Sequence, residues 1–415
     1  MTTLFVTATW PDPLARFTHG VAQRMRLMLR AAQQADADLD LLAFAPWNQP
    51  PDAGAAQRLR NDLQALWGVR VRHVFVAPSE PVADRQDSLW HGYLLPMTSL
   101  QRQPSFARTS GRTQAHAVAD ALAKSRPTCL FVHKLTAMCA VLNCSAARPR
   151  MVLDLDDVEH KAFARLIALP PHWGAKRLLR GWLPALARGE RRALAAADRA
   201  FVCSELDRAD LATRWGLNNL VVVPNAIPVP EPTPLPAART ALFLGMHSYE
   251  PNRAGAEFLV HEVWPLVHAQ VPDATLVVAG RACERIRGHA EPPLGVRFEG
   301  FVDDLQALYA STRVVCCPIL SGGGTRIKII EGAMQARPIV STTVGAEGLD
   351  FSPQRQEIAI ADGAQAFAKA LVQLLLDEDL AAAMGRRARQ QAQALYGEQP
   401  VMDRIAAVLR SLPTP

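Results

Sequence analysis

The chain has 415 residues, of which 49% are hydrophobic and 20% are charged. This length and composition support a large packed core in one or two domains and exclude global disorder. The formal net charge of +6 suits an anionic ligand or an anionic membrane surface, and it is too small to indicate nucleic-acid binding by itself.

The seven cysteines are odd in number and show no Cys-x-x-Cys spacing. This argues against a disulfide scaffold and a structural zinc site, and for a reducing compartment. No apolar run reaches about 18 residues, and the first ten residues lack a basic region followed by a long apolar stretch. We therefore expect a cytoplasmic protein without a spanning helix or a signal peptide, and peripheral contact with the inner face of the membrane stays open.

Short apolar runs alternate with helical segments such as Val21–Gln34 in the first half of the chain. This alternation is typical of a parallel α/β sheet. The expected strands are Thr3–Thr7, Leu39–Phe44, Val71–Val76, Cys129–His133, Met151–Leu155, Ala200–Val202 and Leu220–Val223. The stretch Asp87–Arg112 has no clear period, and it predicts either a flexible loop or a pair of helices that is hard to recognise.

Six of the thirteen residues from Pro224 to Pro236 are prolines. Such a stretch cannot hold a helix or a central strand, and it indicates a linker between two domains. We place a first domain at residues 1–227, the linker at 228–240 and a second domain at 241–398. The remaining residues, 399–415, are expected to form a helix that returns to the first domain.

A second α/β series follows the linker. The expected strands are Ala241–Leu244, Ala274–Ala279, Val296–Phe298, Val314–Pro318, Pro338–Ser341 and Glu357–Ile360. The expected helices are Ala254–Gln270 with Asn252 as its N-cap, Thr325–Gln335, Ala364–Leu376, Glu378–Leu395 and Val401–Leu409. The chain therefore predicts an α/β protein with two doubly wound, Rossmann-like domains, which bind ligands in a cleft at the carboxyl ends of their strands.

The segment Ser321–Glu331 (SGGGTRIKIIE) carries the strongest chemical signal. It joins a predicted strand to a predicted helix, and its three glycines let the backbone N–H groups approach a phosphate at the helix start. Thr325 adds a hydroxyl, and Arg326 and Lys328 place two cations in the first turn, where they repel the helix dipole unless an anion lies nearby. Glu331 can accept hydrogen bonds from a sugar or ribose diol. The alternative is a glycine-rich turn with solvated basic residues.

The chain has neither a Gly-x-Gly-x-x-Gly fingerprint after its first strand nor a P-loop motif. Residues 322–338 (GGGTRIKIIEGAMQARP) resemble instead the nucleotide-sugar motif of the retaining glycosyltransferases of family 4, which have the GT-B fold. Further similar segments are Val223–Asn225, Phe243–Gly245, Pro251–Asn252, Phe298–Val302, Ser341–Gly348, and, in the first half, Leu155–Glu159 and Ala195–Ser204.

The resemblance implies two Rossmann-like domains facing each other across a cleft. It implies an enzyme that moves a hexosyl or related sugar from a nucleoside-diphosphate sugar to a glycan, a lipid-linked or another acceptor, with retention of anomeric configuration. It further implies a role in polysaccharide or glycolipid synthesis, with no metal and no cofactor beyond the donor substrate.

The resemblance also implies roles for single residues. Glu331 stands where the family binds the donor ribose, and Gly323 stands where many members have a glutamate that contacts the transferred sugar. Gly324, Thr325 and Arg326 fall where the family holds the diphosphate. The implied donor-binding set is Gly20, Gly245, Arg253, Gly323, Gly324, Thr325, Arg326, Lys328 and Glu331, and the implied catalytic set is His133, Arg326 and Lys328.

Met246 and the pair Asn252–Arg253 fall where the family often has two cations after the first strand of the second domain. The arginine of this pair can supply one charge, and the alternative is a solvated residue in the first turn. Arg326 or Lys328 can compensate for the missing second charge.

In the first domain, His133 ends a predicted strand, where similar enzymes carry a histidine that touches the sugar near the reacting carbon. The alternative is a partly buried structural histidine. Gly20 follows the loop after the first strand, where the family brings backbone N–H groups to the diphosphate, and His19 lies beside it. The alternative for this glycine is an ordinary helix entry.

Two further segments admit two readings each. Asp154–Asp156 matches the Asp-x-Asp pattern with which GT-A glycosyltransferases hold a metal, yet the separate glycine-rich site leads us to expect Asp156 and Asp157 on the acceptor side or capping a helix. Trp173–Arg192 mixes tryptophan, leucine and basic residues and suits an anionic bilayer surface, as a lipid-linked acceptor would require. The alternative for this segment is an ordinary amphipathic helix pair.

Two other functions stay open at this point. A sugar-nucleotide epimerase of the same fold would need an acid–base pair near the donor, which the sequence does not reveal. A catalytically silent relative that acts as a partner subunit would fit the replacement of the first motif glutamate by Gly323.

Overall fold

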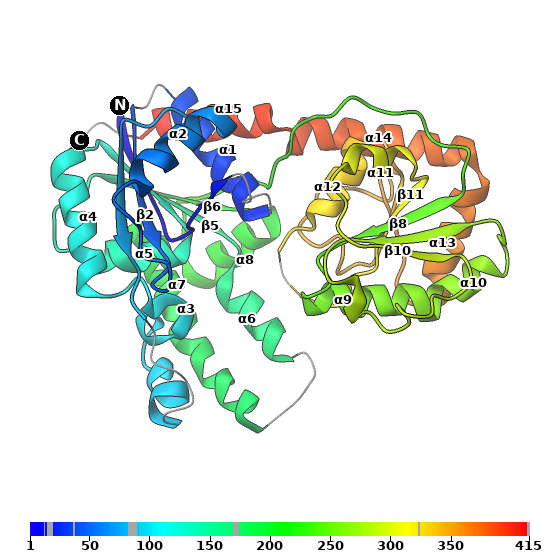
Figure 1. Ribbon diagram of the computed structural model, residues 1–415, viewed down its shortest axis with the longest axis horizontal. Coiled ribbons are helices and arrows are strands. Elements are labelled where there is room, and N and C mark those ends of the chain that lie inside the picture. Colours follow the sequence, from blue (N-terminus) through cyan, green and yellow to red (C-terminus); the bar gives the residue numbers. More distant parts are fainter. Residues whose placement is uncertain are drawn as a thin grey trace. The chain divides into compact units, whose positions relative to one another are not determined.

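The computed structural model describes residues 1–11, 13–14, 20–35, 38–81, 89–168, 174–322 and 324–412. The chain divides into two compact units: unit 1 is Met1–Pro224 with Val401–Pro415, and unit 2 is Asn225–Pro400. Each unit is a parallel sheet with helices on both faces (Figure 1). Every helix in the described ranges is too short or too polar to span a lipid bilayer.

Unit 1 contains a seven-stranded sheet in the order β3-β2-β1-β4-β5-β6-β7. Its strands are β1 (Thr2–Thr7), β2 (Asp38–Ala45), β3 (His73–Pro78), β4 (Cys129–His133), β5 (Arg150–Asp156), β6 (Arg199–Val202) and β7 (Leu220–Val222). The strand order reverses between β1 and β4, which pair directly. The carboxyl ends of these two strands therefore form the topological switch point of unit 1.

The larger helices of unit 1 are α1 (Gly20–Gln34), α2 (Ala55–Trp67), α4 (Arg112–Ser125), α5 (Lys134–Asn143), α6 (Glu159–Ala168), α7 (Leu183–Ala196) and α8 (Glu205–Trp215). Between α2 and α4 lie the short helices η2 (Trp90–Leu94), η3 (Leu95–Met97), η4 (Leu100–Arg102) and α3 (Pro104–Ala107). The described part of Asp87–Arg112 is thus largely helical, which favours the second of the two alternatives, helices that are hard to recognise. Pro96 lies second in η3 and Pro104 begins α3, and these prolines interrupt the helical period, which explains why the sequence shows none.

Unit 2 contains a six-stranded parallel sheet in the order β10-β9-β8-β11-β12-β13. Its strands are β8 (Thr240–Leu244), β9 (Thr275–Ala279), β10 (Val296–Glu299), β11 (Val314–Cys317), β12 (Ile339–Ser341) and β13 (Ala359–Ile360). The order reverses between β8 and β11, which defines the switch point of unit 2. Every strand predicted from the sequence is confirmed, with ends shifted by at most two residues.

The helices of unit 2 are α9 (Glu250–Phe258), η6 (Leu259–Val263), α10 (Trp264–His268), η7 (Cys283–Arg285), α11 (Leu305–Ala310), α12 (Ile327–Met334), α13 (Ala364–Leu376) and α14 (Glu378–Tyr396). The last helix, α15 (Glu398–Arg410), carries the chain from unit 2 into unit 1. In unit 1, Arg404 on α15 donates to the carbonyl of Val222 at 3.1 Å, and Arg410 donates to the carbonyl of Gln34.

The prediction that Asn252 caps a helix is wrong. The helix begins at Glu250, its N-cap is Tyr249, and Asn252 lies inside the first turn. Pro251 explains the earlier start, because proline is favoured in the first turn of a helix, where its missing N–H is not needed.

The proline-rich segment is fastened to unit 2 by arginine side chains. Prolines lack an N–H but keep their carbonyl acceptors, so guanidinium groups can satisfy them. The bonds are Arg389 Nη2 to Pro230 O at 2.8 Å, Arg337 Nη1 to Pro234 O at 3.1 Å and Arg313 Nε to Pro236 O at 3.1 Å. All three arginines belong to unit 2, so this stretch is held on the surface of that unit.

Candidate functional site

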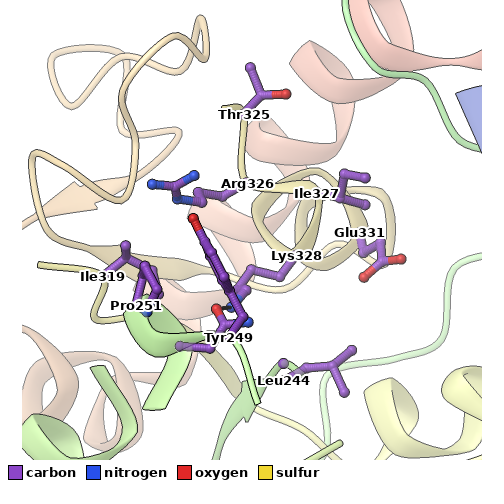
Figure 2. A pocket seen from close by; sticks show the side chains of 11 residues that line it. Leu244, Tyr249, Pro251, Ile319, Thr325, Arg326, Ile327, Lys328 and Glu331 are labelled. Carbon is purple, nitrogen blue, oxygen red and sulfur yellow. Dashed lines mark hydrogen bonds between the residues drawn. The ribbon is translucent and has the colours of Figure 1, made fainter. Parts of the chain in front are cut away.

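A pocket of about 300 Å³ opens at the switch point of unit 2, where β8 and β11 end. Its wall comes from the carboxyl end of β8, the start of α9, the segment after β11 and the first turns of α12 (Figure 2). The lining residues are Leu244, Gly245, Tyr249, Pro251, Asn252, Ile319, Thr325, Arg326, Ile327, Lys328 and Glu331. Five of the nine predicted donor-binding residues therefore share one pocket.

The glycine-rich turn needs glycine for two reasons. Gly322 has φ of 101° and Gly324 has φ of 77°, which are left-handed conformations that favour glycine. A Cβ atom on Gly322 would also lie 3.0 Å from the hydroxyl of Tyr249 and from Cγ of Pro251, so a side chain there would crowd both neighbours. The predicted donor residue Gly323 lies outside the described residues.

Thr325 and Arg326 connect this turn to α12. The hydroxyl of Thr325 accepts a hydrogen bond from Nδ2 of Asn225 at 2.9 Å. Arg326 is the N-cap of α12, and its Nη1 donates to the carbonyl of Gly324 at 2.7 Å. The guanidinium thus lies at the positive end of the helix dipole, and the side chains of Arg326 and Tyr249 extend toward one another (Figure 2).

Lys328 supplies a second cation from the same helix. Its ammonium donates to Oδ1 of Asn252 at 2.8 Å and lies 4.4 Å from the centre of the Phe243 ring. Burial lowers the pKa of Lys328 to about 8, and the nearby positive charge of Arg326 acts in the same direction. The ammonium can therefore lose its proton just above neutral pH.

Glu331 lies one turn further along α12, in the same pocket. The buried hydroxyl of Tyr309 donates to its Oε2 at 3.2 Å. Burial raises the pKa of Glu331, while the bond from Tyr309 and the charge of Lys328 oppose this rise. The site therefore combines a cation at the N-cap of α12 with a second cation and a carboxyl group on the helix itself.

The remaining predicted donor residues are placed elsewhere. Arg253 forms an ion pair with Glu250 on its own helix, and the pocket wall does not include it. Met246 is 56% exposed, and Asn252, which stands where the resemblance expects a cation, accepts from Lys328. Gly20 begins α1 in unit 1, and His19 lies outside the described residues.

His133 lies at the switch point of unit 1, at the end of β4. Its ring is fully buried, and its Nδ1 forms a hydrogen bond with the hydroxyl of Thr7 at 3.0 Å. Burial lowers the pKa of His133 to about 3, so the ring is neutral at physiological pH. A contact between this histidine and a sugar stays a prediction.

The two aspartates of the Asp-x-Asp segment form ion pairs with basic residues. Arg24 on α1 binds the buried carboxylate of Asp154 through two nitrogens, the shorter bond being 2.6 Å. Asp156 pairs with Lys134 at 2.8 Å, and both residues have positive φ values, 65° and 71°. Such backbone strain in residues other than glycine often marks a functional region. In the described ranges, no three His, Cys, Asp or Glu side chains gather in a way that could hold a metal.

Sequence reasoning missed several residues of the pocket, above all Tyr249 and Ile319, and it missed Tyr309 behind Glu331. The first two follow strands β8 and β11, so the switch-point rule applied to the predicted strand order could have found them. Tyr309 has no such signal, because only the packing of α11 beside α12 brings its hydroxyl to the carboxylate.

Comparisons with known proteins agree with this geometry. Residues 238–377 match the family described as "Glycosyl transferases group 1". An "Uncharacterized 44.6 kDa protein in cps region" of Klebsiella pneumoniae is 26% identical over 140 residues, which are 32% of this chain and 36% of that protein. The chain thus matches about a third of the length of this relative.

Solved structures resemble the whole chain. Sucrose-phosphate synthase from Thermosynechococcus elongatus superposes with a TM-score of 0.68 and 17% identity, covering 99% of this chain and 98% of that one. Anabaena HepE, solved in complex with UDP-glucose, gives a TM-score of 0.61 and 14% identity over 99% and 100% of the two chains. The fold is therefore the two-domain, Rossmann-like fold of the GT-B class, and the family match in unit 2 supports a glycosyltransferase.

Proposed function

We propose that this protein transfers a sugar from a nucleoside-diphosphate sugar to a hydroxyl group of a glycan, a lipid-linked or another acceptor. The proposal depends on one observation above all. Thr325, Arg326, Lys328 and Glu331 line the same pocket at the switch point of unit 2, where sheets of this type bind nucleotides.

Each group in the pocket suits one part of such a donor. The guanidinium of Arg326 and the ammonium of Lys328 match the two phosphates, and the positive end of α12 adds to their field. Glu331 offers carboxylate oxygen that can accept hydrogen bonds from the vicinal hydroxyls of the ribose. Tyr309 holds the other side of this carboxylate in place through the bond to Oε2.

The chemistry needs charge stabilisation more than it needs a general acid. As the bond between the anomeric carbon and the phosphate oxygen breaks, the sugar becomes cationic and the diphosphate gains negative charge. Arg326 and Lys328 would stabilise that charge, and each such group contributes about 2.7–4 kcal/mol in other enzymes.

We propose retention of the anomeric configuration. The acceptor hydroxyl would attack the anomeric carbon on the face from which the diphosphate departs, and its proton would pass to the leaving phosphate oxygen. Because two protein cations already neutralise the diphosphate, the step should proceed without a metal ion, and EDTA should leave the rate unchanged. A loss of activity in EDTA that Mn²⁺ restores would contradict this point.

We propose a role in polysaccharide or glycolipid synthesis, which would agree with the relative from a cps region. We further propose a peripheral contact with anionic membrane through unit 1. Leu89, Trp90 and Leu166 are 61%, 53% and 52% exposed, and the exposed Arg177 and Arg180 lie on η5 (Gly174–Trp182). The helices η2 and η5 pack together in unit 1, as the 2.8 Å bond from the Trp182 ring to the carbonyl of Tyr93 shows.

The direct test is a panel of UDP-, GDP- and ADP-sugars. Thermal unfolding with each donor should identify the nucleotide, because a bound ligand raises the midpoint by mass action. Release of the nucleoside diphosphate from that donor, with and without a glycolipid extract, then measures transfer. Stimulation of release by the extract supports a transferase, whereas conversion of the donor sugar without any acceptor would point to an epimerase. Binding without turnover under either condition would indicate a silent relative.

A further inference from the structure

The side chain of Asn252 makes two hydrogen bonds that bear on the pocket. Its Oδ1 accepts from the ammonium of Lys328 at 2.8 Å, and its Nδ2 donates to the carbonyl of Met246 at 3.0 Å. An ammonium can only donate and a carbonyl can only accept, so both bonds require the same orientation of the amide. The amide therefore cannot be flipped without losing both.

The backbone around Asn252 is also held. Its N–H donates to the carbonyl of Tyr249 at 3.1 Å, and Pro251 fixes φ immediately before it in the first turn of α9. Lys328 lies 76 residues further along the chain, on α12. Asn252 thus presents a rigid acceptor to a long, flexible side chain that comes from a different helix.

Gly245 leaves the space that this pair occupies. A Cβ atom at Gly245 would lie 3.1 Å from Nδ2 of Asn252 and 3.3 Å from the ammonium of Lys328. Contacts this short would push the amide or the ammonium out of place. The glycine predicted as a donor-binding residue is therefore also the residue that makes room for the pair.

Other charged and titratable groups face the ammonium from several elements. Arg326 precedes it on the chain, Glu331 follows it on α12, and Cys317 ends β11. His247 lies after β8 and has a lowered pKa, caused first by burial. Burial raises the pKa of Cys317, so its thiol is neutral near pH 8. Asn252 differs from these groups because it is neutral and does not titrate, and its Oδ1 accepts directly from the ammonium of Lys328.

We propose that Asn252 is a positioning residue for Lys328: its Oδ1 accepts a hydrogen bond from one N–H of the ammonium and thereby directs the other two N–H groups into the pocket. This proposal rests on the proposed function for its ligand, a nucleoside diphosphate. An amide oxygen accepts a stronger hydrogen bond from the ammonium than from the neutral amine, and it therefore favours the charged form of lysine. Asn252 therefore keeps the ammonium both in place and protonated at a pH where burial alone would remove the proton.

The first test needs no ligand. The chain has six lysines, so the Lys328 signal in spectra of ¹³C-lysine-labelled protein can be assigned by its loss in Lys328→Gln, with the exposed Lys369→Gln as the matched control. We expect Asn252→Ala to lower the titration midpoint of Lys328 by roughly one pH unit and Asn252→Asp to raise it. Opposite shifts separate an effect on the ammonium from a general loosening of the loop, which would move both variants the same way. Midpoints that stay at the value of the parent in both variants would overturn the proposal.

The second test uses UDP, GDP and ADP as calorimetric probes at pH 7.5 and pH 9. Asn252→Ala should bind the preferred nucleotide roughly tenfold more weakly than the parent, with the larger loss at pH 9. Asn61→Ala, the same chemical change on the exposed face of α2, should bind like the parent. Parent-like affinity of Asn252→Ala at both pH values would refute the role in binding.

The two tests separate the two claims. If no nucleotide bound to the parent while the Lys328 midpoint still moved in opposite directions, the proposed function would fall and the positioning of the ammonium would stand. If the nucleotide bound and the midpoint did not move, the proposed function would stand and the role of Asn252 would fall. Thermal midpoints of all variants, measured in parallel, show which of them are folded.

Discussion

The two units have the same sheet topology at their switch points and fill them differently. In unit 1, the carboxyl ends of β1, β4 and β5 carry Thr7, His133 and Asp154, which are buried and bonded to each other or to Arg24. In unit 2, the ends of β8 and β11 border an open pocket that Arg326 and other polar groups line.

The difference shows that a fully buried ion pair can only stabilise the fold, whereas charged groups that border a pocket can also bind a ligand. An ion pair that is fully buried, such as Arg24 with Asp154, has no remaining surface for a ligand. Lys328 and Glu331 are only partly covered by protein, and they face a cavity in which a charged ligand could take the place of water.

The largest effect is expected for Arg24→Ala. The substitution leaves the carboxylate of Asp154 buried without its cation, and breaking a buried pair in this way costs about 3–5 kcal/mol of stability. The free energy of unfolding in urea measures the loss. The double variant Arg24→Met, Asp154→Leu should recover a large part of it, because no charge is then left unpaired. An Arg24→Ala variant as stable as the parent would show that the buried Arg24–Asp154 pair does not stabilise unit 1.

In unit 2, Arg326→Ala and Glu331→Ala should each reduce transfer by roughly a hundredfold or more while the protein stays folded, as its thermal unfolding transition will show. The first variant loses charge stabilisation of the leaving diphosphate, and the second loses the acceptor for the ribose. Release of the nucleoside diphosphate provides the measurement. Arg239→Ala, at an exposed pair with Asp273, is the matched control and should turn over like the parent. Parent-like turnover of either pocket variant would show that the site assignment is wrong.

A smaller effect, on the affinity for the nucleotide, is expected when the pH is raised. Lys328 has a pKa lowered to about 8, so its ammonium is charged below this pH and loses its charge above it. Affinity for UDP should therefore be steady between about pH 7 and 7.5 and fall by roughly tenfold toward pH 9.5. Lys328→Arg, which stays charged throughout, should remove this fall. A pH profile of the Lys328→Arg variant that matches the parent would mean that another group titrates.

The smallest effect concerns unit 1 and membranes. Binding to vesicles with anionic lipid should exceed binding to neutral vesicles by a few-fold and should decline with salt. Trp90→Ala and the pair Arg177→Gln, Arg180→Gln should each weaken the sedimentation of the protein with anionic vesicles. Equal binding to both vesicle types, or none, would remove the membrane contact from the proposal.

The sequence predicted the strands of both units well, because strands of a parallel sheet are buried on both faces and read as short apolar runs. It also predicted the turn before α12, since Gly322 and Gly324 adopt backbone conformations that other residues avoid. The cap at Asn252 was wrong because Pro251 starts the helix earlier.

The contacts that give the site its character could not be predicted in the same way. Lys328 and Asn252 are 76 residues apart, and Arg24 and Asp154 are 130 residues apart. Local patterns contain no information on which distant side chains will meet. For the same reason, the sequence predicted that His133 ends a strand, but it could not predict that the ring is fully buried and bonded to Thr7.

The proposed function requires that the pocket of unit 2 holds a nucleoside diphosphate. A crystal structure of the protein with UDP, or with the nucleotide that the donor panel selects, tests it most directly. We expect phosphate oxygens within hydrogen-bonding distance of Arg326 and Lys328, and ribose hydroxyls on the carboxylate of Glu331. A nucleotide bound elsewhere, with these three side chains arranged as in the free protein, would contradict it.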